Sequence, residues 1–232
     1  MNRRDELAAN LEAVRVRIAA AERTAGRSPG SVELVVVTKY FPGSDVRILA
    51  DLGITQVGEN KHQEAATKAA ECADLGLHWH FIGSIQSNKA AAIGGYADTV
   101  ESVDRLKLVA PLDRGAQVAG RVVDCLVQVS LDRPDAAGRG GARPGDIAAI
   151  AAAIAGSSAL RLRGLMAVAP LDEPPAEAFA RLASIAQDFV IEHPTATTLS
   201  AGMSEDLEDA VNCGATHVRI GSSVLGPRPV IK

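Results

Sequence analysis

Short apolar runs alternate with helical segments along almost the whole of this 232-residue chain. Each run is separated from the next by enough residues for a crossover helix, so successive strands can lie parallel in one sheet. This order favours helices packed around a parallel sheet whose strands are buried on both faces. The eight predicted strands are Leu34–Val37, Gln56–Asn60, Leu77–Gly83, Thr99–Glu101, Val122–Leu131, Arg161–Met166, Thr197–Ser200 and Val218–Ile220.

Eight strands in this order predict an α/β fold, a (β/α)8 TIM barrel, preceded by one extra helix. That helix is predicted from about Asp5 to Ala25, where apolar residues recur at helical spacing. An open doubly wound sheet is the alternative, but no GxGxxG turn follows the first strand. Hydrophobic residues make up 47% of the chain and aromatic residues only 3%, so aliphatic side chains must fill the core. No linker-like change in composition divides the chain, and we expect a single domain over residues 1–232.

Charge and cysteine content exclude several classes of protein. The net charge of -4 provides no basic surface for nucleic acid. Cys72, Cys125 and Cys213 are far apart and form no CxxC, which favours free thiols in a reducing compartment over disulfides or zinc. The N-terminus has no apolar signal segment, and the longest apolar run, Ile147–Ala155, is too short to span a bilayer. We expect a cytoplasmic protein with neither nucleic acid nor membrane as a partner.

Two serines are expected to cap helices. Ser44 follows Pro42-Gly43, and Ser204 precedes two acids that complement a helix dipole. The segment Asp132–Gly145, rich in Pro, Gly, Arg and Asp, is predicted to be the least ordered.

His78 and His80 alternate around Trp79 and therefore point to one face of their predicted strand. Such a pair can begin a metal site, but no third His or Asp stands at a suitable spacing. We favour a structural role and predict no metal site.

Functional groups of a TIM barrel gather at the carboxyl ends of its strands. Lys39 follows the first strand, and its position alone favours a solvent-reaching lysine, with a Schiff-base amine as the alternative. Arg219 lies inside the eighth strand and needs an acceptor, which could be a bound anion, an aromatic nitrogen or a core carboxylate. Gly221-Ser222-Ser223 follows that strand and suits either a phosphate site or a simple helix start.

Six sequence blocks in a fixed order carry a resemblance to a known family. They are Val35-Val-Val-Thr-Lys39, Gly58-Glu-Asn-Lys-His-Gln-Glu64, Trp79-His-Phe-Ile-Gly83 with Gln86 and Asn88-Lys89, Leu160-Arg-Leu-Arg-Gly-Leu-Met166, Leu199-Ser-Ala-Gly-Met-Ser204, and Val218-Arg-Ile-Gly-Ser222. With these blocks the chain resembles the pyridoxal phosphate homeostasis proteins, single barrels that bind pyridoxal 5′-phosphate (PLP). The resemblance runs from about Val32 to Gly226 and is highly specific because several blocks occur together.

The resemblance implies a set of cofactor-binding residues. Lys39 would form the internal aldimine, a Schiff base, with PLP, and Arg219 would face the pyridine nitrogen. The remaining cofactor-binding residues would be Gly221, Ser222 and Ser204 at the phosphate, and Asn60, Met203 and Ser200 along the cofactor.

The chain departs from the family pattern at two places. Many members carry a second lysine two positions after the Schiff-base lysine, where this chain has Phe41. Many also carry a Lys-Ser-Gly-like loop, where this chain has Gly138-Arg-Gly-Gly141. Arg139 keeps the positive charge there but does not readily form a Schiff base. If those two lysines of the family pass the cofactor on or hold a second PLP, this chain lacks the residues for that step.

The implied site favours binding over catalysis. An arginine opposite the pyridine nitrogen disfavours its protonation, so the ring is a weaker electron sink. Amino-acid racemases of the alanine racemase type share this arrangement and are the enzyme alternative, but they add a β-rich domain with a catalytic tyrosine. This chain ends about six residues after Gly226, and Tyr40 is expected to point away from Lys39 across a strand.

We therefore predict a PLP-binding monomer without catalytic residues, which buffers or delivers PLP inside the cell. Apo-forms of PLP enzymes are its expected protein partners. A third alternative is a barrel enzyme that acts on a phosphorylated metabolite without PLP.

Overall fold

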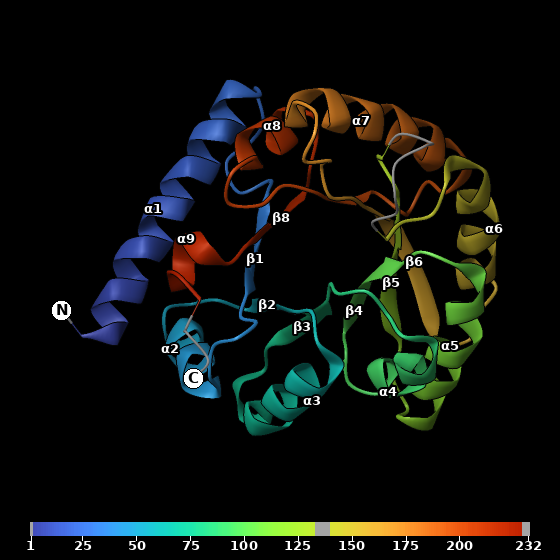
Figure 1. Ribbon diagram of the computed structural model, residues 1–232, viewed down its shortest axis with the longest axis horizontal. Helices are drawn as coiled ribbons and strands as arrows, with labels where there is room; N and C mark the ends of the chain where they lie inside the picture. Colours follow the sequence, from blue (N-terminus) through green and yellow to red (C-terminus); the bar gives the residue numbers. More distant parts are fainter. Residues whose placement is uncertain (1, 133–139, 229–232) are drawn as a thin grey trace.

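The barrel closes through hydrogen bonds between its first and last strands. A computed structural model of the chain describes residues 2–132 and 140–228. Across these residues, eight parallel strands follow one another in sequence order, and β8 pairs with β1. Figure 1 shows the closed ring with the helices outside it, so the predicted (β/α)8 barrel is confirmed. The strands are β1 (Glu33–Val37), β2 (Gln56–Glu59), β3 (His78–Phe81), β4 (Thr99–Val103), β5 (Val123–Gln128), β6 (Leu160–Met166), β7 (Thr198–Ser200) and β8 (His217–Ile220).

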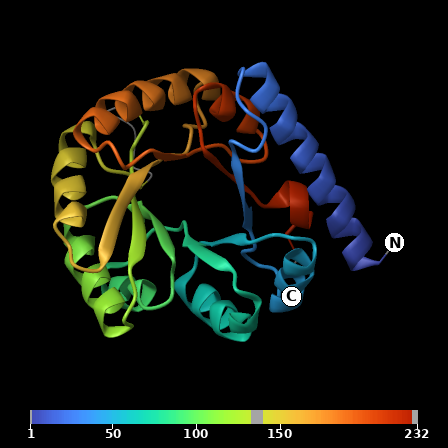
Figure 2. The ribbon, with the colours of Figure 1, turned by 180° about the vertical axis from the view of Figure 1, so that it is seen from behind.

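Helices surround the ring, and the helix predicted before the barrel is α1. Its N-terminus is capped by Asn2, whose side-chain oxygen accepts the N–H of Asp5 at 2.9 Å. Figures 1 and 2 show α1 outside the ring, along α8 and α9, where it buries an apolar stripe that includes Leu7 and Leu11. The helices are α1 (Arg3–Thr24), α2 (Gly43–Asp51), α3 (His62–Glu71), α4 (Ala90–Gly94), α5 (Val109–Val118), α6 (Pro144–Ala155), α7 (Pro175–Glu192), α8 (Leu207–Asn212) and α9 (Ser222–Leu225).

Aliphatic side chains make up most of two buried clusters. One spans β3 to β7 and helices α4 to α7, and the other joins α1 and α2 to β1 and β8. The barrel interior is partly polar, with buried His80, Glu101, Ser200 and Arg219. Burial of such groups is costly unless they are paired, so their partners define what this interior can do. None of the helices described here is long and apolar enough to cross a membrane.

Both serine caps predicted from the sequence are wrong. Helix α2 begins at Gly43, so Ser44 lies inside it, and the N-cap is Pro42, whose carbonyl accepts the N–H of Asp45. Helix α8 begins at Leu207 with Asp206 as its N-cap, two residues later than a Ser204 cap would require. The Asp206 carboxylate accepts the N–H of Met203 at 2.6 Å and closes a turn that includes Ser204.

Two further differences concern strand ends and a loop. Strand β1 ends at Val37, so Lys39 and Tyr40 lie in a turn, and the expected opposite orientation of their side chains across a strand is wrong. Strand β5 ends at Gln128, earlier than predicted. Residues 133–139 of the predicted poorly ordered segment, Arg139 included, lie outside the described residues.

Candidate functional site

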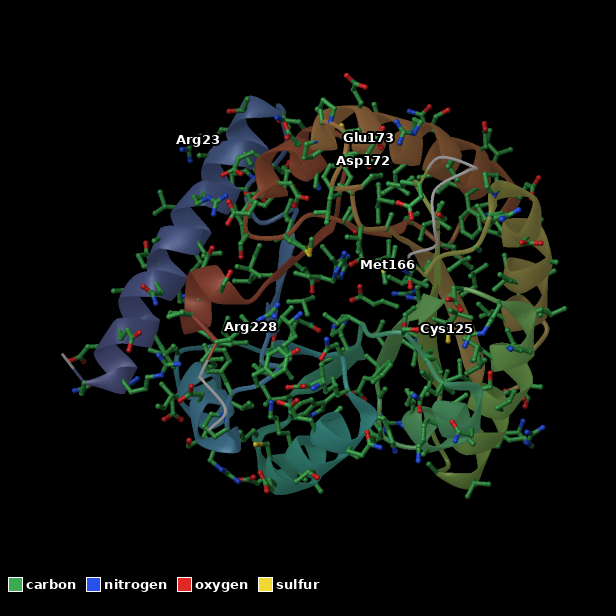
Figure 3. The ribbon with its side chains drawn as sticks, in the orientation of Figure 1. Arg23, Cys125, Met166, Asp172, Glu173 and Arg228 are labelled. Atoms are coloured by element: carbon green, nitrogen blue, oxygen red, sulfur yellow. The ribbon has the colours of Figure 1, made fainter. Side chains whose placement is uncertain are left out.

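A cavity of about 280 Å³ opens at the carboxyl ends of β1 and β8. It lies between the turns after β1, β7 and β8 and the segment that follows α9. Figure 3 shows Arg228, one of its lining residues, beside α9. The cavity is lined by Val37, Lys39, Tyr40, Phe41, Ile82, Met203, Ser204, Glu205, Asp206, Arg219, Gly221, Ser222, Gly226 and Arg228.

Lys39 reaches this cavity from the turn after β1. The residue is half-buried and lines the cavity. The next residue, Tyr40, has a φ of 72°, which is uncommon for a bulky side chain. Because the chain turns sharply here, Lys39 and Tyr40 line the same cavity. The amine of a lysine and the phenol of a tyrosine are therefore close to one binding space.

Arg219 forms an inner wall of the cavity. The residue is 4% exposed, and it donates to the Ser200 hydroxyl at 2.7 Å and to the Ala167 carbonyl at 2.8 Å. A Glu101 carboxylate oxygen lies 3.7 Å from the same guanidinium. Burial lowers the pKa of Arg219, while the charges of Glu101 and Asp206 raise it. A guanidinium has five N–H donors, so Arg219 retains donors for a ligand in the cavity.

A buried carboxylate behind the cavity compensates the Arg219 charge. Glu101 accepts the Ser200 hydroxyl at 2.6 Å and lies 2.7 Å from Nδ1 of His80. Burial alone would raise the pKa of Glu101, but the hydrogen bond and charge of His80, the charge of Arg219 and the bond from Ser200 lower it to about 2. Sequence reasoning missed Glu101, although a carboxylate in an apolar strand was a signal that could have found it. Both alternatives for Arg219 therefore have a structural basis, since it has a carboxylate partner and also faces the cavity.

The two histidines of β3 lie inside the barrel. His78 is hydrogen-bonded to Thr99 at 2.8 Å, and the rings of His78 and His80 are 4.9 Å apart. His80 also contacts the Gln56 side chain at 2.8 Å. Over residues 2–132 and 140–228, no group of three or more His, Cys, Asp or Glu side chains is arranged to hold a metal ion.

Two hydroxyl groups from different turns meet in the wall of the cavity. The Oγ atoms of Ser204, after β7, and Ser222, after β8, lie 3.2 Å apart. Gly221 lets the second turn pack against β1, because a Cβ there would lie 3.2 Å from the Val37 carbonyl. The first N–H groups of a helix have no intrahelical acceptor, so Ser222 at the start of α9 also offers its backbone donor. This corner combines hydroxyl and N–H donors that suit a phosphate group.

The structure brings most of the residues predicted for the site together. Six of them line the cavity, namely Lys39, Met203, Ser204, Arg219, Gly221 and Ser222. Ser200 does not line it and lies behind Arg219, to which its hydroxyl is bonded. Asn60 does not line it either, and its Oδ1 is buried without a hydrogen-bond partner in the described part of the chain.

Residues at the cavity mouth were missed by sequence reasoning. The Tyr40 ring lies 5.0 Å from the Lys61 amine and 5.2 Å from the Arg228 guanidinium. Both distances are within the range of cation–π contacts. Arg228 follows α9 and belongs to no helix or strand, so the sequence around it gives no local signal. Only the fold of the segment after α9 brings it to Tyr40.

The cavity fits PLP in its donor groups. A phosphate requires several hydrogen-bond donors, an aldehyde requires an amine, and a pyridine nitrogen requires an N–H donor. The Ser204–Ser222 corner, Lys39 and Arg219 carry groups of these three kinds around one cavity. A closed barrel with such a site at the ends of β1 and β8 defines a class of protein, a (β/α)8 barrel whose cavity suits PLP.

Comparison with known proteins agrees with this class and narrows it. Residues 9–229 match the model of the family described as alanine racemase, N-terminal domain. The pyridoxal phosphate homeostasis protein of Mycobacterium tuberculosis is 45% identical, over 98% of this chain and 95% of its own. The structure of PipY of Synechococcus elongatus with PLP bound matches with a TM-score of 0.80 and 34% identity, over 95% of this chain and 100% of that one. The chain belongs to the pyridoxal phosphate homeostasis protein family.

Alanine racemases are more distant in sequence. The enzyme of Clostridium difficile matches with a TM-score of 0.71 but is 15% identical, over 97% of this chain and 57% of that one. This likeness shows the shared barrel fold alone.

Proposed function

We propose that this chain binds PLP covalently at Lys39 and takes part in PLP homeostasis, buffering or delivering the cofactor without turning over a substrate. The observation that carries the proposal is that Lys39, Arg219 and the Ser204–Ser222 pair line one cavity. The relatives named as pyridoxal phosphate homeostasis proteins and the PLP complex of PipY support it.

Each wall of the cavity has a separate role in this proposal. Lys39 supplies the amine, and the Ser204 and Ser222 hydroxyls donate hydrogen bonds to the phosphate. Arg219 donates an N–H to the ring nitrogen and keeps it unprotonated, because a second positive charge beside a guanidinium is unfavourable. When bound, PLP supplies an aldehyde that condenses with an amine and a ring that can accept electrons. Asn60, Met203 and Ser200 complete the proposed cofactor-binding set.

A buffering or delivery role requires that the cofactor can leave again. The cavity is accessible from solvent, since its lining residues Arg228 and Ser222 are exposed. We propose apo-forms of PLP enzymes as recipients, a monomer as the working form, and the cytoplasm as the compartment. The three cysteines are free thiols, which favours a reducing compartment.

Visible absorbance tests the central claim. Purified protein is titrated with PLP, and the adduct is reduced with borohydride and located by mass spectrometry. We expect one PLP on Lys39 and no covalent adduct in Lys39→Ala. Lys107→Ala is the matched control, because Lys107 is exposed and does not line the cavity. A wild-type protein that stays colourless would overturn the proposal and favour the barrel enzyme that acts without PLP.

One observation favours the racemase alternative. Tyr40 lines the same cavity as Lys39, so a phenol is available beside the amine. Racemisation of several amino acids is therefore measured with the PLP-loaded protein and with Tyr40→Phe. Turnover typical of enzymes that is lost in Tyr40→Phe would establish the racemase and refute the non-catalytic role.

A further inference from the structure

We propose that Glu59, Glu64 and Lys68 position the Lys39 amine by holding the residues on both sides of it. The inference rests on the proposed function, since it assigns the residues that hold the proposed PLP-binding amine in place. None of the three lines the cavity, and they form a cluster where β2 and α3 meet the turn after β1, with Glu59 and Lys68 buried and Glu64 half-buried.

The residue before Lys39 is held at every polar atom. The Thr38 N–H donates to the Gly58 carbonyl at 3.0 Å and extends the pairing of β1 with β2. The Thr38 hydroxyl donates to Glu59 at 2.6 Å, and its carbonyl accepts from Lys68 at 2.7 Å. Thr38 is 0% exposed and Glu59 is 1% exposed, so these bonds are shielded from water. The peptide group that leads into Lys39 is therefore fixed.

Lys68 links the two acids of the cluster. Its ammonium lies 2.7 Å from Glu59 and 2.8 Å from Glu64, in addition to the Thr38 carbonyl. An ammonium has three N–H donors, so these contacts use all of them. Lys68 is 5% exposed, and its pairing with carboxylates makes it a structural lysine despite its nearness to the site.

The residue after Lys39 is held by the same cluster. The Tyr40 N–H donates to Glu64 at 2.6 Å, to the carboxylate oxygen that also accepts from Lys68. Tyr40 adopts a φ of 72°, and an aromatic residue keeps such a conformation only when its surroundings impose it. The Glu64 bond and the contacts of the ring with Lys61 and Arg228 impose it here. The backbone on both sides of Lys39 is thus anchored to β2 and α3.

Anchoring this turn has a kinetic consequence. An amine held next to a binding space reacts as if at high concentration, whereas loss of positioning by about 1 Å can lower a rate on the order of 100-fold. Release of the turn is therefore expected to slow covalent attachment of PLP to Lys39 by about 10- to 100-fold. Non-covalent binding of the phosphate and ring should be unchanged, because it depends on Ser204, Ser222 and Arg219 and not on the turn that carries Lys39.

The variants Glu64→Ala and Lys68→Met test this inference against Glu71→Ala, a matched control on α3. The Glu71 residue is exposed, whereas the Glu64 side chain is 24% exposed and the Lys68 side chain 6%. Attachment of PLP is followed by stopped-flow absorbance, and binding of pyridoxine 5′-phosphate, which lacks the aldehyde, by calorimetry. In the cofactor-free proteins, reductive methylation of Lys39 is measured by mass spectrometry with Lys89 and Lys107 as internal references.

We expect slower attachment in Glu64→Ala and Lys68→Met, and unchanged binding of pyridoxine 5′-phosphate within about 2-fold. Methylation of Lys39 should be faster relative to Lys89 and Lys107. Glu71→Ala should behave as the wild type. Should Lys68→Met fail to fold, Glu64→Ala still decides the question. Wild-type attachment rates in Glu64→Ala would overturn the inference and leave the proposed function intact, whereas failure of the wild type to attach PLP would overturn the proposed function itself.

Discussion

Replacement of Glu101 by glutamine tests the buried charge pair behind the cavity. The substitution keeps the shape of the side chain and removes the charge that compensates Arg219. The pKa of Glu101 is lowered from 4.5 to about 2 in the folded protein. Each unit of difference between the folded and unfolded states corresponds to about 1.4 kcal/mol, so the carboxylate stabilises the fold by about 3 kcal/mol at neutral pH. Loss of one partner from a buried pair typically costs about 3–5 kcal/mol, which is consistent with this value.

Urea unfolding of the cofactor-free wild type and Glu101→Gln measures this difference. We expect a free energy of unfolding about 3 kcal/mol lower in the variant at pH 7. Since the folded-state pKa is the lower one, the contribution is present above the unfolded pKa and is lost as the pH falls towards 2. The difference between the two proteins should therefore stay constant down to about pH 5 and shrink below it.

Glu33→Gln provides the matched control for this measurement. The Glu33 side chain is 54% exposed and lies 3.7 Å from His217, so its loss should change stability by less than about 1 kcal/mol. Equal stability of wild type and Glu101→Gln at pH 7 would refute the reasoning. A difference that does not shrink in acid would refute the assignment of the effect to the charge of Glu101.

Three further predictions concern the other parts of the molecule. The double variant Ser204→Ala/Ser222→Ala should bind PLP about 100-fold more weakly in equilibrium dialysis, because two hydrogen bonds to a charged group are removed. Its affinity for pyridoxal, which has no phosphate, should be unchanged, and an equal loss for both ligands would contradict the phosphate assignment. Arg219→Met should lower the free energy of unfolding by about 3–5 kcal/mol, because it leaves the Glu101 carboxylate charged and buried without its arginine partner. An unaltered urea midpoint would show that the contacts with Ser200 and His80 are enough to stabilise that carboxylate. Of the three cysteines, Cys213 should react first with a thiol reagent in the native protein, because it is only half-buried. Cys125 should react only after unfolding, because it is fully buried and burial raises its pKa. Labelling of Cys125 at the rate of Cys213 would mean that β5 opens readily.

The strand pattern is the part of the fold that could be read from the sequence. Apolar runs such as Leu34–Val37 depend on local composition and burial on both faces, and the structure places β1 at Glu33–Val37. The helix before the barrel was predicted for the same reason, since its apolar stripe recurs with the helical period. Lys39 could then be placed near the functional end of the barrel, because it follows a predicted strand and functional groups of a TIM barrel gather at the carboxyl ends of its strands.

Helix starts and strand ends depended on backbone geometry that residue preferences do not determine. Ser44 and Ser204 are good capping residues, yet α2 starts two residues too early for a Ser44 cap, and the N-cap of α8 is Asp206. Strand β1 ends at Val37, so Lys39 and Tyr40 share a turn. That turn brings the Tyr40 phenol into the cavity, where the sequence predicted no phenol.

Contacts between distant segments were decided by the tertiary structure alone. Glu101 meets Arg219 only because the barrel closes, and Ser204 meets Ser222 only because the turns after β7 and β8 converge. Thr38 and Tyr40 are likewise held by residues of β2 and α3. The sequence by itself determined the order of the strands and which residues stand at their ends, because these follow from local pattern. Which charges are paired, and which of those residues face one cavity, depends on distances across the ring that no local pattern contains.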